Sequence, residues 1–455
     1  MRNRIDKIIS KLKSKCDYID VRMEEKKSLS VNLRDGKLDH VGEALSAGGC
    51  VRVCTKGGWS FASFNKISDL ERYAGQAVEQ ARIVGNGKTC LGEVEPIIDD
   101  YSTEILDDPR NHSTEEKIEI LKSYDDVIKS VEGVSNRFAS YSEGFIKKSF
   151  YSSEGAAITQ NLMDLTYAVN ASANKDGLSQ NGSISGGSSN TFSVIFDHHK
   201  LLKENAESAV QLLSAPKVKA GVYTVIVDPK LAGVFVHEAF GHTSEADNCA
   251  ENPQLAKVMT MGTVFGSPIL NIYDTGLDIG CRGFLKYDDE GVAGEHTQLI
   301  KDGKLVGRLH SRETAGKLNE RPTGNARALN YGFAPIPRMR NTCIQNGKTT
   351  FDEMLSEVKD GLYVVDAHGG CGGEDFSFSA RLGYMIRNGK LCEKVRNVKL
   401  SGNLWETMKN IDAVGNDFFI KDSPGGCGKG PQFPLPVSHA SPHIRIQKVS
   451  VGGDS

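Results

Sequence analysis

The sequence has no long apolar segment. None of its 455 residues belong to a stretch approaching the roughly 18 uninterrupted apolar residues that a membrane-spanning helix requires. The basic opening from Arg2 to Lys15 does not resemble a secretory signal, because its apolar residues recur at helical spacing with lysine and arginine between them. We therefore expect a protein that does not interact with a membrane and that works in the cytoplasm.

An excess of one charge is also missing. The 55 lysines and arginines nearly balance the 58 aspartates and glutamates, for a formal net charge of −3, and no basic cluster stands out. Nucleic-acid binding by phosphate neutralisation needs such a cluster, so we expect no nucleic-acid partner. The ten cysteines are scattered without paired spacing, which argues against a disulfide framework and fits a reducing compartment.

The first half of the chain reads as a mixture of hairpins and amphipathic helices. Asp35-Gly36 and Gly57-Gly58 each separate two alternating runs, which is the pattern of a β-hairpin. Ser113 and Glu116 form a capping box that opens a helix to about Val131. Helical periodicity is also present at residues 2–15, 67–83 and 197–213, whereas residues 91–112 have none and predict a connection.

A chain of this length exceeds one ordinary hydrophobic core, so more than one packed unit is expected. The pattern predicts an α+β protein with antiparallel or mixed β-sheets and flanking helices. We predict two domains, an N-terminal α+β domain over residues 1–216, with a candidate sub-boundary near 91–112, and a C-terminal domain over residues 217–455.

The second half opens with a strand that leads directly into a helix. The β-branched run from Val222 to Val227 is typical of a buried strand. Asp228 can then cap a helix whose first position is Pro229, where the missing proline N–H costs nothing. His237 is therefore expected about two turns into this helix.

The run from His237 to His242 has the pattern His-Glu-x-x-x-His. The shorter pattern His-Glu-x-x-His binds zinc because residues four apart share a helix face. Five residues of a regular α-helix advance about 500°, which sets the two rings about 140° apart around the axis. Chelation would require either a π-type extra residue or a helix ending near Gly241. Otherwise His237 is an ordinary helix histidine and Glu238 a solvated carboxylate.

A catalytic zinc site also needs a third protein ligand and an open position. Cys427 ranks first by context, because a thiolate in a glycine-rich loop can approach a metal closely and nearby Lys429 would favour the deprotonated form. Spacing alone does not choose it. The other candidates are Glu245, Asp247, Cys249, His296, His310, His368, Cys371, His439 and His443.

Several separated motifs, in order, resemble the TldD/PmbA family of metallopeptidases. The resemblance is strongest at the segment 236–247 and extends through most of the second half, whereas the first half matches only in its general layout. The further motifs are residues 287–291, 299–303, 323–327, 335–342, 415–417, 427–429 and 449–453.

The resemblance implies a zinc-dependent peptidase that hydrolyses short or unfolded peptides, including leader segments of modified peptides. Carried over residue by residue, it implies that His237, His242 and Cys427 hold Zn2+ and that Glu238 is the general base. It also implies a dimer, either a homodimer or a heterodimer with a related subunit that lacks the motif. The loops at 369–375 and 433–442 depart from the usual family pattern, which bears on substrate preference.

Two other functions fit the same residues. The chain could be a peptide-binding or regulatory subunit with a structural zinc, or a zinc hydrolase of a non-peptide amide. Three further side chains have both a functional and a structural interpretation: Glu245 as partner of a ligand imidazole or as an ordinary carboxylate, and Arg338 and Asn341 as substrate contacts or as turn residues.

Overall fold

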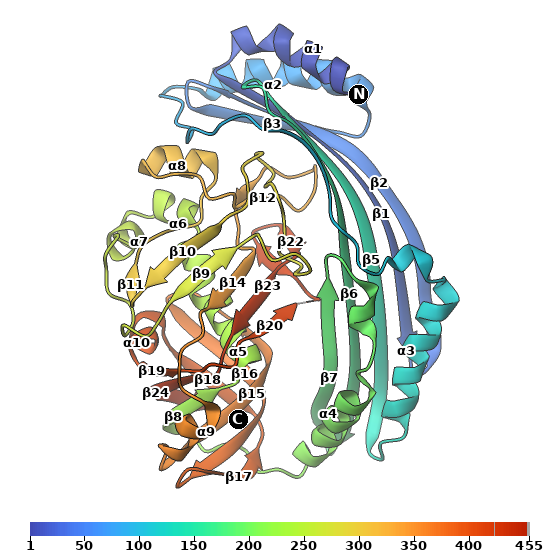
Figure 1. Ribbon diagram of the computed structural model, residues 1–455, viewed down its shortest axis with the longest axis vertical. Coiled ribbons are helices and arrows are strands. Elements are labelled where there is room, and N and C mark those ends of the chain that lie inside the picture. The colour runs from blue at the N-terminus through green and yellow to red at the C-terminus, as the bar shows by residue number, and fades with distance from the viewer. Residues whose placement is uncertain (423, 453–455) are drawn as a thin grey trace.

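The computed structural model of the protein describes residues 1–422 and 424–452. Ser423, which begins the glycine-rich segment before Cys427, and Gly453 of the last motif lie outside this range. The strands of the first 190 residues form one sheet, and the later strands form a separate group of sheets beside it (Figure 1).

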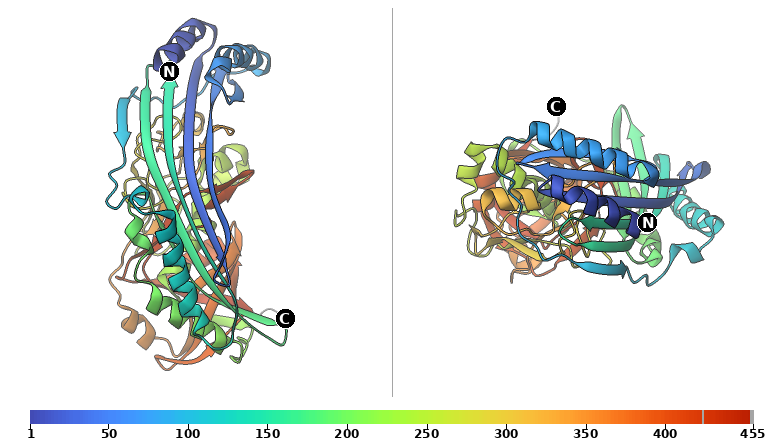
Figure 2. Two further views of the ribbon diagram at one scale, coloured as in Figure 1. Left: turned by 90° about the vertical axis from the view of Figure 1, so that its right-hand side faces the viewer. Right: turned by 90° about the horizontal axis from the view of Figure 1, so that it is seen from above.

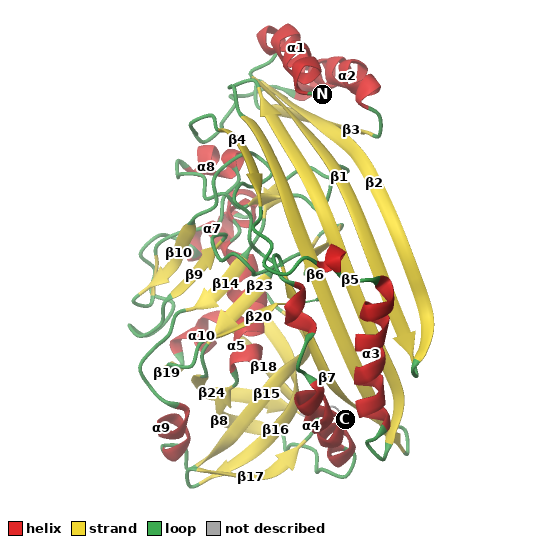
Figure 3. Cartoon of the chain, turned by 45° about the vertical axis from the view of Figure 1, so that its right-hand side comes forward, coloured by secondary structure: helices red, strands yellow, loops and turns green. Residues whose placement is uncertain are grey.

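The first sheet is built on four strands of 17 to 19 residues, which run most of the length of the molecule (Figures 2 and 3). Its order is β3-β2-β1-β5-β6-β4, with β7 also paired to β6. Asp35 and Gly36 connect β1 to β2 with positive φ angles, the left-handed conformation that the Asp-Gly hairpin pattern predicts. The strands are β1 Tyr18–Arg34, β2 Lys37–Thr55, β3 Gly58–Phe64, β4 Ile98–Ser102, β5 Val134–Ser152, β6 Ala157–Lys175 and β7 Leu178–Ser188.

Four helices cover this sheet. Helices α1 (Arg2–Leu12) and α2 (Leu70–Val84) pack their apolar faces against β1 and β2 at one end. Helices α3 (Thr114–Lys129) and α4 (His199–Leu212) share a second core with β5, β6 and β7. The predicted capping box of α3 is present, since Ser113 and Glu116 bond each other's backbone N–H groups.

The second half contains two larger sheets. The six-stranded sheet has the order β11-β10-β9-β14-β23-β20. Its strands are β9 Ile272–Thr275, β10 His296–Lys301, β11 Lys304–Leu305, β14 Asn341–Ile344, β20 Phe419–Asp422 and β23 Ser438–Ser441. The other sheet has the order β15-β8-β24-β18-β16-β17, with β19 paired to β24. Its strands are β8 Gly221–Val227, β15 Asp360–Cys371, β16 Asp375–Arg387, β17 Lys390–Val395, β18 Val398–Asn403, β19 Ile411–Val414 and β24 Ile444–Gly452.

Helix α5 (Pro229–Phe235) contacts a strand from each of these sheets, β15 and β23. Its Phe235 ring packs edge-on against Phe376 and Phe378 of β16. The remaining short elements are the ribbons β12 Ala326–Arg327 with β13 Ile336–Pro337 and β21 Cys427–Lys429 with β22 Gln432–Leu435, and the helices α6 Ala246–Glu251, α7 Pro253–Val258, α8 Arg312–Leu318, α9 Phe351–Ser356 and α10 Leu404–Lys409.

The α+β class with antiparallel and mixed sheets is confirmed. Most strand pairs are antiparallel, while β8 with β15, β14 with β23 and β4 with β6 run parallel. Residues 91–112 link α2 to α3, as the predicted connection requires, but they include the short strand β4, which was not predicted. Helices α6, α7 and α8 were not predicted. The two-domain division stays a prediction. No described helix combines the length and apolar character needed to cross a membrane.

Candidate metal centre

The segment that carries both motif histidines begins at a well-formed helix cap. The side chain of Asp228 accepts a hydrogen bond of 2.9 Å from the backbone N–H of Leu231, and Pro229 occupies the first helical position. After Phe235 the helix changes to π geometry over Val236–Gly241 and then to a 3-10 turn over His242–Ser244. The structure therefore adopts the π-type alternative of the two that the motif spacing allows.

The π segment brings the two histidines to one side of the helix. Because a π-helix bonds residues five apart, it stacks His237 and His242 as an α-helix would stack residues four apart. Their ring centroids lie 5.5 Å apart, and His237 is 3% exposed. The π geometry of the backbone thus accommodates the extra residue between the two histidines.

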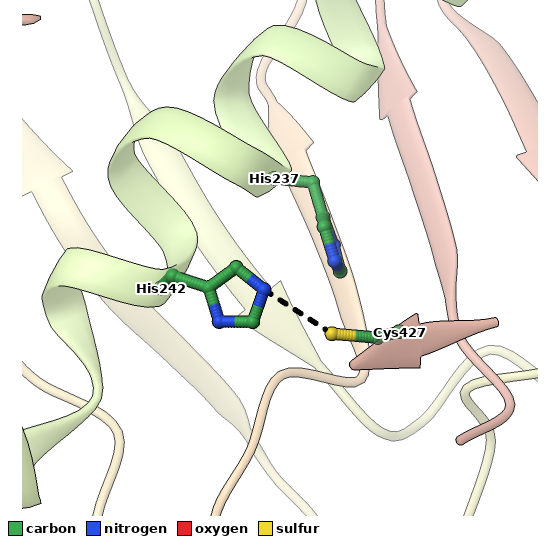
Figure 4. Close-up of side chains that lie close together, drawn as sticks. All are labelled: His237, His242 and Cys427. Carbon is green, nitrogen blue, oxygen red and sulfur yellow. Dashed lines mark hydrogen bonds between the residues drawn. The ribbon is translucent and has the colours of Figure 1, made fainter. Parts of the chain in front are cut away.

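Cys427 reaches the same place from the ribbon β21–β22, 185 residues further along the chain. Its Sγ lies 3.3 Å from Nε2 of His242 (Figure 4). One nitrogen from each of His237 and His242 and the sulfur of Cys427 all lie within 4.8 Å of one another. The structure therefore brings together the three side chains named as ligands.

The electrostatics of the three groups favour a thiolate. Burial by itself would raise the pKa of Cys427, but the neighbouring His237 and His242 outweigh burial and lower that pKa to about 4. Burial would lower the pKa of His242, but hydrogen bonds to Cys427 and Glu245 raise it to about 10. Lys429, which was expected to favour the thiolate, instead pairs with Glu245 and Asp247 at 2.9 and 2.7 Å.

The donor set fits zinc. Two imidazoles and a thiolate are ligands that zinc prefers, and the three donors are one fewer than a closed structural site contains. The Nδ1 atom of His237 is buried and has no hydrogen-bond partner among the described residues, so this donor set includes an unsatisfied buried polar atom.

Glu238 stands beside this group at the wall of a cavity. Its Oε2 lies 3.8 Å from Nε2 of His242, and its side chain is 34% exposed. The cavity has a volume of about 610 Å³ and is lined by residues of α4, β7, β15, β20 and the motif helix. His237 and Glu238 are both part of its wall, so this cavity adjoins the candidate ligands.

Three domain models of one known protein family together match nearly the whole chain. Residues 220–453 match the PmbA/TldA metallopeptidase C-terminal domain, residues 19–81 match domain 1 and residues 107–213 match the central domain. A metalloprotease of Synechocystis is 40% identical over 99% of this chain and 98% of its own length. The chain belongs to the PmbA/TldD family.

Other members are similar over the same span. A metalloprotease of Methanocaldococcus jannaschii is 35% identical over 96% of this chain and 97% of its own, and a zinc metalloprotease TldD homolog of Saccharolobus solfataricus is 29% identical over 96% of each. The fold is shared with TldE of Thermococcus kodakarensis, at a TM-score of 0.76 and 14% identity over 99% of this chain and 100% of that one. A Thermotoga maritima protein whose name refers to DNA gyrase modulation superimposes with a TM-score of 0.80 at 21% identity, over 99% and 100%.

In this protein, Glu245 is a buried partner of His242, one of the candidate ligands. Its carboxylate is fully buried, with Oε2 lying 3.2 Å from Nδ1 of His242 and 2.9 Å from Nζ of Lys429. Arg338 is also fully buried and lies 3.8 Å from the other carboxylate oxygen. Glu245 is therefore not a solvated carboxylate, and Arg338 packs behind the site and is absent from the cavity wall.

The other ligand candidates lie outside the group. His439 packs beside His237, with ring centroids 6.0 Å apart, but is not among the clustered ligand atoms. His310 bonds Glu320, and His443 bonds Asp417. Asn341 is buried on β14 and does not line the cavity. Lys429 links the Cys427 ribbon to the segment after His242 through its ion pairs with Glu245 and Asp247. No sequence pattern predicted these ion pairs.

We expect Glu245→Gln to weaken zinc binding by about 10–100-fold, the usual effect of removing a carboxylate that orients a metal-ligating histidine. The same change leaves the buried Arg338 without its anionic partner, which should cost roughly 3–5 kcal/mol of unfolding free energy, whereas Lys429 keeps Asp247. Competition with a zinc chelator and denaturant unfolding measure the two effects. Glu251→Gln, an exposed carboxylate of α6, is the control. Unchanged zinc affinity in Glu245→Gln would contradict the assignment.

The metal-free protein is expected to hold Cys427 as a thiolate well into the acidic range. Its ultraviolet thiolate absorbance should persist as the pH falls to about 4, whereas an ordinary thiol loses it below about 8.5. Cys427→Ala should remove this component. Cys249→Ala should retain it, because burial raises the pKa of that thiol. Absorbance that develops only above neutral pH would contradict the thiolate.

Proposed function

We propose that this chain is a zinc-dependent peptidase that hydrolyses short or unfolded peptides. His237, His242 and Cys427 hold the metal, and Glu238 is the general base. The observation that carries the proposal is the convergence of the three ligand atoms within 4.8 Å, beside a carboxylate that faces a cavity. The metalloprotease names of relatives that match the whole chain support the reaction class.

Each residue of the proposed site has a role that follows from its position. Bound zinc would supply a Lewis acid for the substrate carbonyl and for water. Glu238 takes a proton from the attacking water and passes it to the leaving amine, for which its partly exposed position at the cavity wall is suited. Glu245 holds the imidazole of His242 through Nδ1, which leaves Nε2 directed toward Cys427.

A non-catalytic regulatory subunit is the alternative. A structural zinc site normally has four closed protein ligands, and three donors beside an accessible carboxylate favour catalysis. The dimer belongs to the proposal as well, either of two identical chains or with a motif-lacking relative. The shared fold of TldE motivates the second arrangement.

The purified chain is expected to contain one zinc per chain and to cleave an unfolded peptide mixture. A chelator should abolish cleavage, and added zinc should restore it, because three ligands hold the metal reversibly. Elemental analysis and mass spectrometry of the products make the measurement. Zinc without cleavage, alone or with a TldE-like partner, would favour the regulatory subunit, and the absence of zinc would refute the proposal.

A further inference from the structure

Two lysines of the cavity wall are not used by the proposed chemistry. Lys230 belongs to α5 and Lys421 to β20, and both side chains are partly buried. Elements α5 and β20 are in contact (Figure 1). Phe419 and Lys421 share one face of β20, because side chains alternate along a strand. Nζ of Lys230 lies 5.9 Å from the centre of the Phe419 ring, so both lysines border the same part of the cavity.

This part of the cavity lies about two helical turns from the proposed zinc ligands. Lys230 precedes His237 by seven residues, which is about two turns, so the two side chains share a helix face roughly 10 Å apart along the axis. Lys421 pairs with His439 across β20 and β23, and His439 packs against His237. An extended peptide rises about 3.3 Å per residue. A group two or three residues from the scissile bond would therefore reach the lysines.

The positive charge of the two lysines is not balanced by an ion pair. Among the described residues, no carboxylate oxygen lies within 4.0 Å of either Nζ; the only partner of Lys421 is Ser185, at 2.9 Å to Oγ and through the backbone carbonyl. Three acidic residues near them have other partners. Asp228 accepts from the backbone N–H of Leu231 at 2.9 Å, Asp366 pairs with Arg381 at 3.4 Å, and Asp422 accepts from Ser438 Oγ at 2.5 Å. Burial, reinforced by Lys230 and only partly offset by Asp366 and Asp422, lowers the pKa of Lys421 to about 8.

The surroundings fit a peptide residue that ends in a carboxylate. Val234, Leu201 and Phe419 line the same cavity and provide apolar walls for an aliphatic stem. We propose that Lys230 and Lys421 form a subsite that binds a substrate carboxylate two or three residues from the scissile bond. The carboxylate belongs either to an acidic side chain or to the peptide's C-terminus. This subsite rests on the proposed peptidase function and adds a substrate preference to it.

The test compares kcat/KM for peptides of one parent sequence with a mapped cleavage site. Glutamine or glutamate is placed at each position in turn, and the C-terminus is either free or amidated. We expect one glutamate position, or the free terminus, to raise kcat/KM at least about tenfold, the effect of one hydrogen bond to a charged group. A gain that survives amidation identifies a side chain, and a gain lost on amidation identifies the terminus.

Removing either lysine charge should reduce the preference in kcat/KM, measured as the ratio of glutamate to glutamine peptide or of free to amidated peptide, toward one. The variants are Lys230→Met, Lys421→Met and their combination. Lys421→Arg should retain the ratio, and Lys301→Met, an exposed lysine at the β10–β11 turn, should not change it. Lys230→Met alone is decisive if loss of the Ser185 contact destabilises the Lys421 variants. A ratio near one in the wild type, or a ratio that the Lys230 variant does not alter, would overturn the subsite.

The same experiment separates the subsite from the peptidase. Chelator-sensitive cleavage of all peptides at equal rates would refute the subsite and leave the peptidase intact. If no peptide is cleaved, the proposed function fails, and calorimetric binding of the glutamate and glutamine peptides to the zinc-loaded chain then tests the subsite directly. Binding of the glutamate peptide at least about tenfold tighter would support the subsite, and equal binding would refute it.

Discussion

Replacing Glu238 by glutamine should lower kcat for peptide hydrolysis by roughly 10²–10⁴-fold, the usual contribution of a general base. Glutamine keeps the size of the side chain and its ability to form hydrogen bonds, but it cannot accept the proton of the attacking water. The variant should still contain one zinc per chain, because Glu238 is not among the three clustered ligand atoms. Steady-state kinetics on one peptide and elemental analysis of the same preparation measure both quantities.

The control for this variant is Glu251→Gln, which removes an exposed carboxylate from the nearby helix α6 and should not change kcat. A Glu238→Gln protein with nearly wild-type kcat would exclude Glu238 as the base. A protein that loses its zinc would instead make Glu238 a ligand, since its Oε2 is 3.8 Å from Nε2 of His242. Full zinc with collapsed turnover is the result that the proposed mechanism requires.

The motif could be located from the sequence, but its backbone conformation could not. Spacing shows that a regular helix fails to bring His237 and His242 together. It allows either a π-type extra residue or a helix that ends near Gly241, and it does not choose between them. The choice depends on packing, since Phe240 lies fully buried against Phe265 on one side of the π segment and Phe235 packs on β16. These contacts join the segment to distant parts of the chain, so no local pattern encodes them.

Cys427 illustrates a different limit. It is separated from His242 by 185 residues, so periodicity says nothing about their proximity. Its glycine-rich context ranked it first among several candidates, and the family resemblance made it the chosen third ligand. Glu245 was identified as a candidate because it follows His242 by three residues. The role of Lys429 depends on the β21–β22 ribbon reaching Glu245, which is a tertiary contact. Local rules therefore identified His237, Glu238, His242 and Glu245, whereas the positions of Cys427 and Lys429 depend on tertiary contacts.

The fold shows the same division between local and long-range information. Turn chemistry at Asp35-Gly36 and the capping box at Ser113 are local, and both are present as expected. Strand β4 escaped prediction because its sequence, Ile98–Ser102, is short and polar. It is ordered by parallel pairing with β6, more than fifty residues away in the chain. The parallel pairing of β8 with β15 likewise joins distant segments.

Cys427→Ala should lower zinc affinity by more than the 10–100-fold expected for Glu245→Gln, because it removes a ligand atom and not the partner of one. The wild-type protein gains about 2.7 kcal/mol of stability when free zinc is 100 times Kd, since the metal binds only the folded state. At the same zinc concentration the variant should gain little or nothing. Thermal unfolding with and without zinc measures this difference.

The comparison must separate loss of the metal from loss of packing, since Cys427 is only 2% exposed. Cys249→Ala is the matched control, because Cys249 is also buried, at 3%, but lies outside the ligand group. Both alanine variants should lose some stability without metal, and only Cys249→Ala should recover the full zinc-dependent gain. Equal zinc-dependent stabilisation of the two variants would remove Cys427 from the ligand set. His237 and His242 would then be the only two of the three proposed ligands left, one fewer than a catalytic zinc site has.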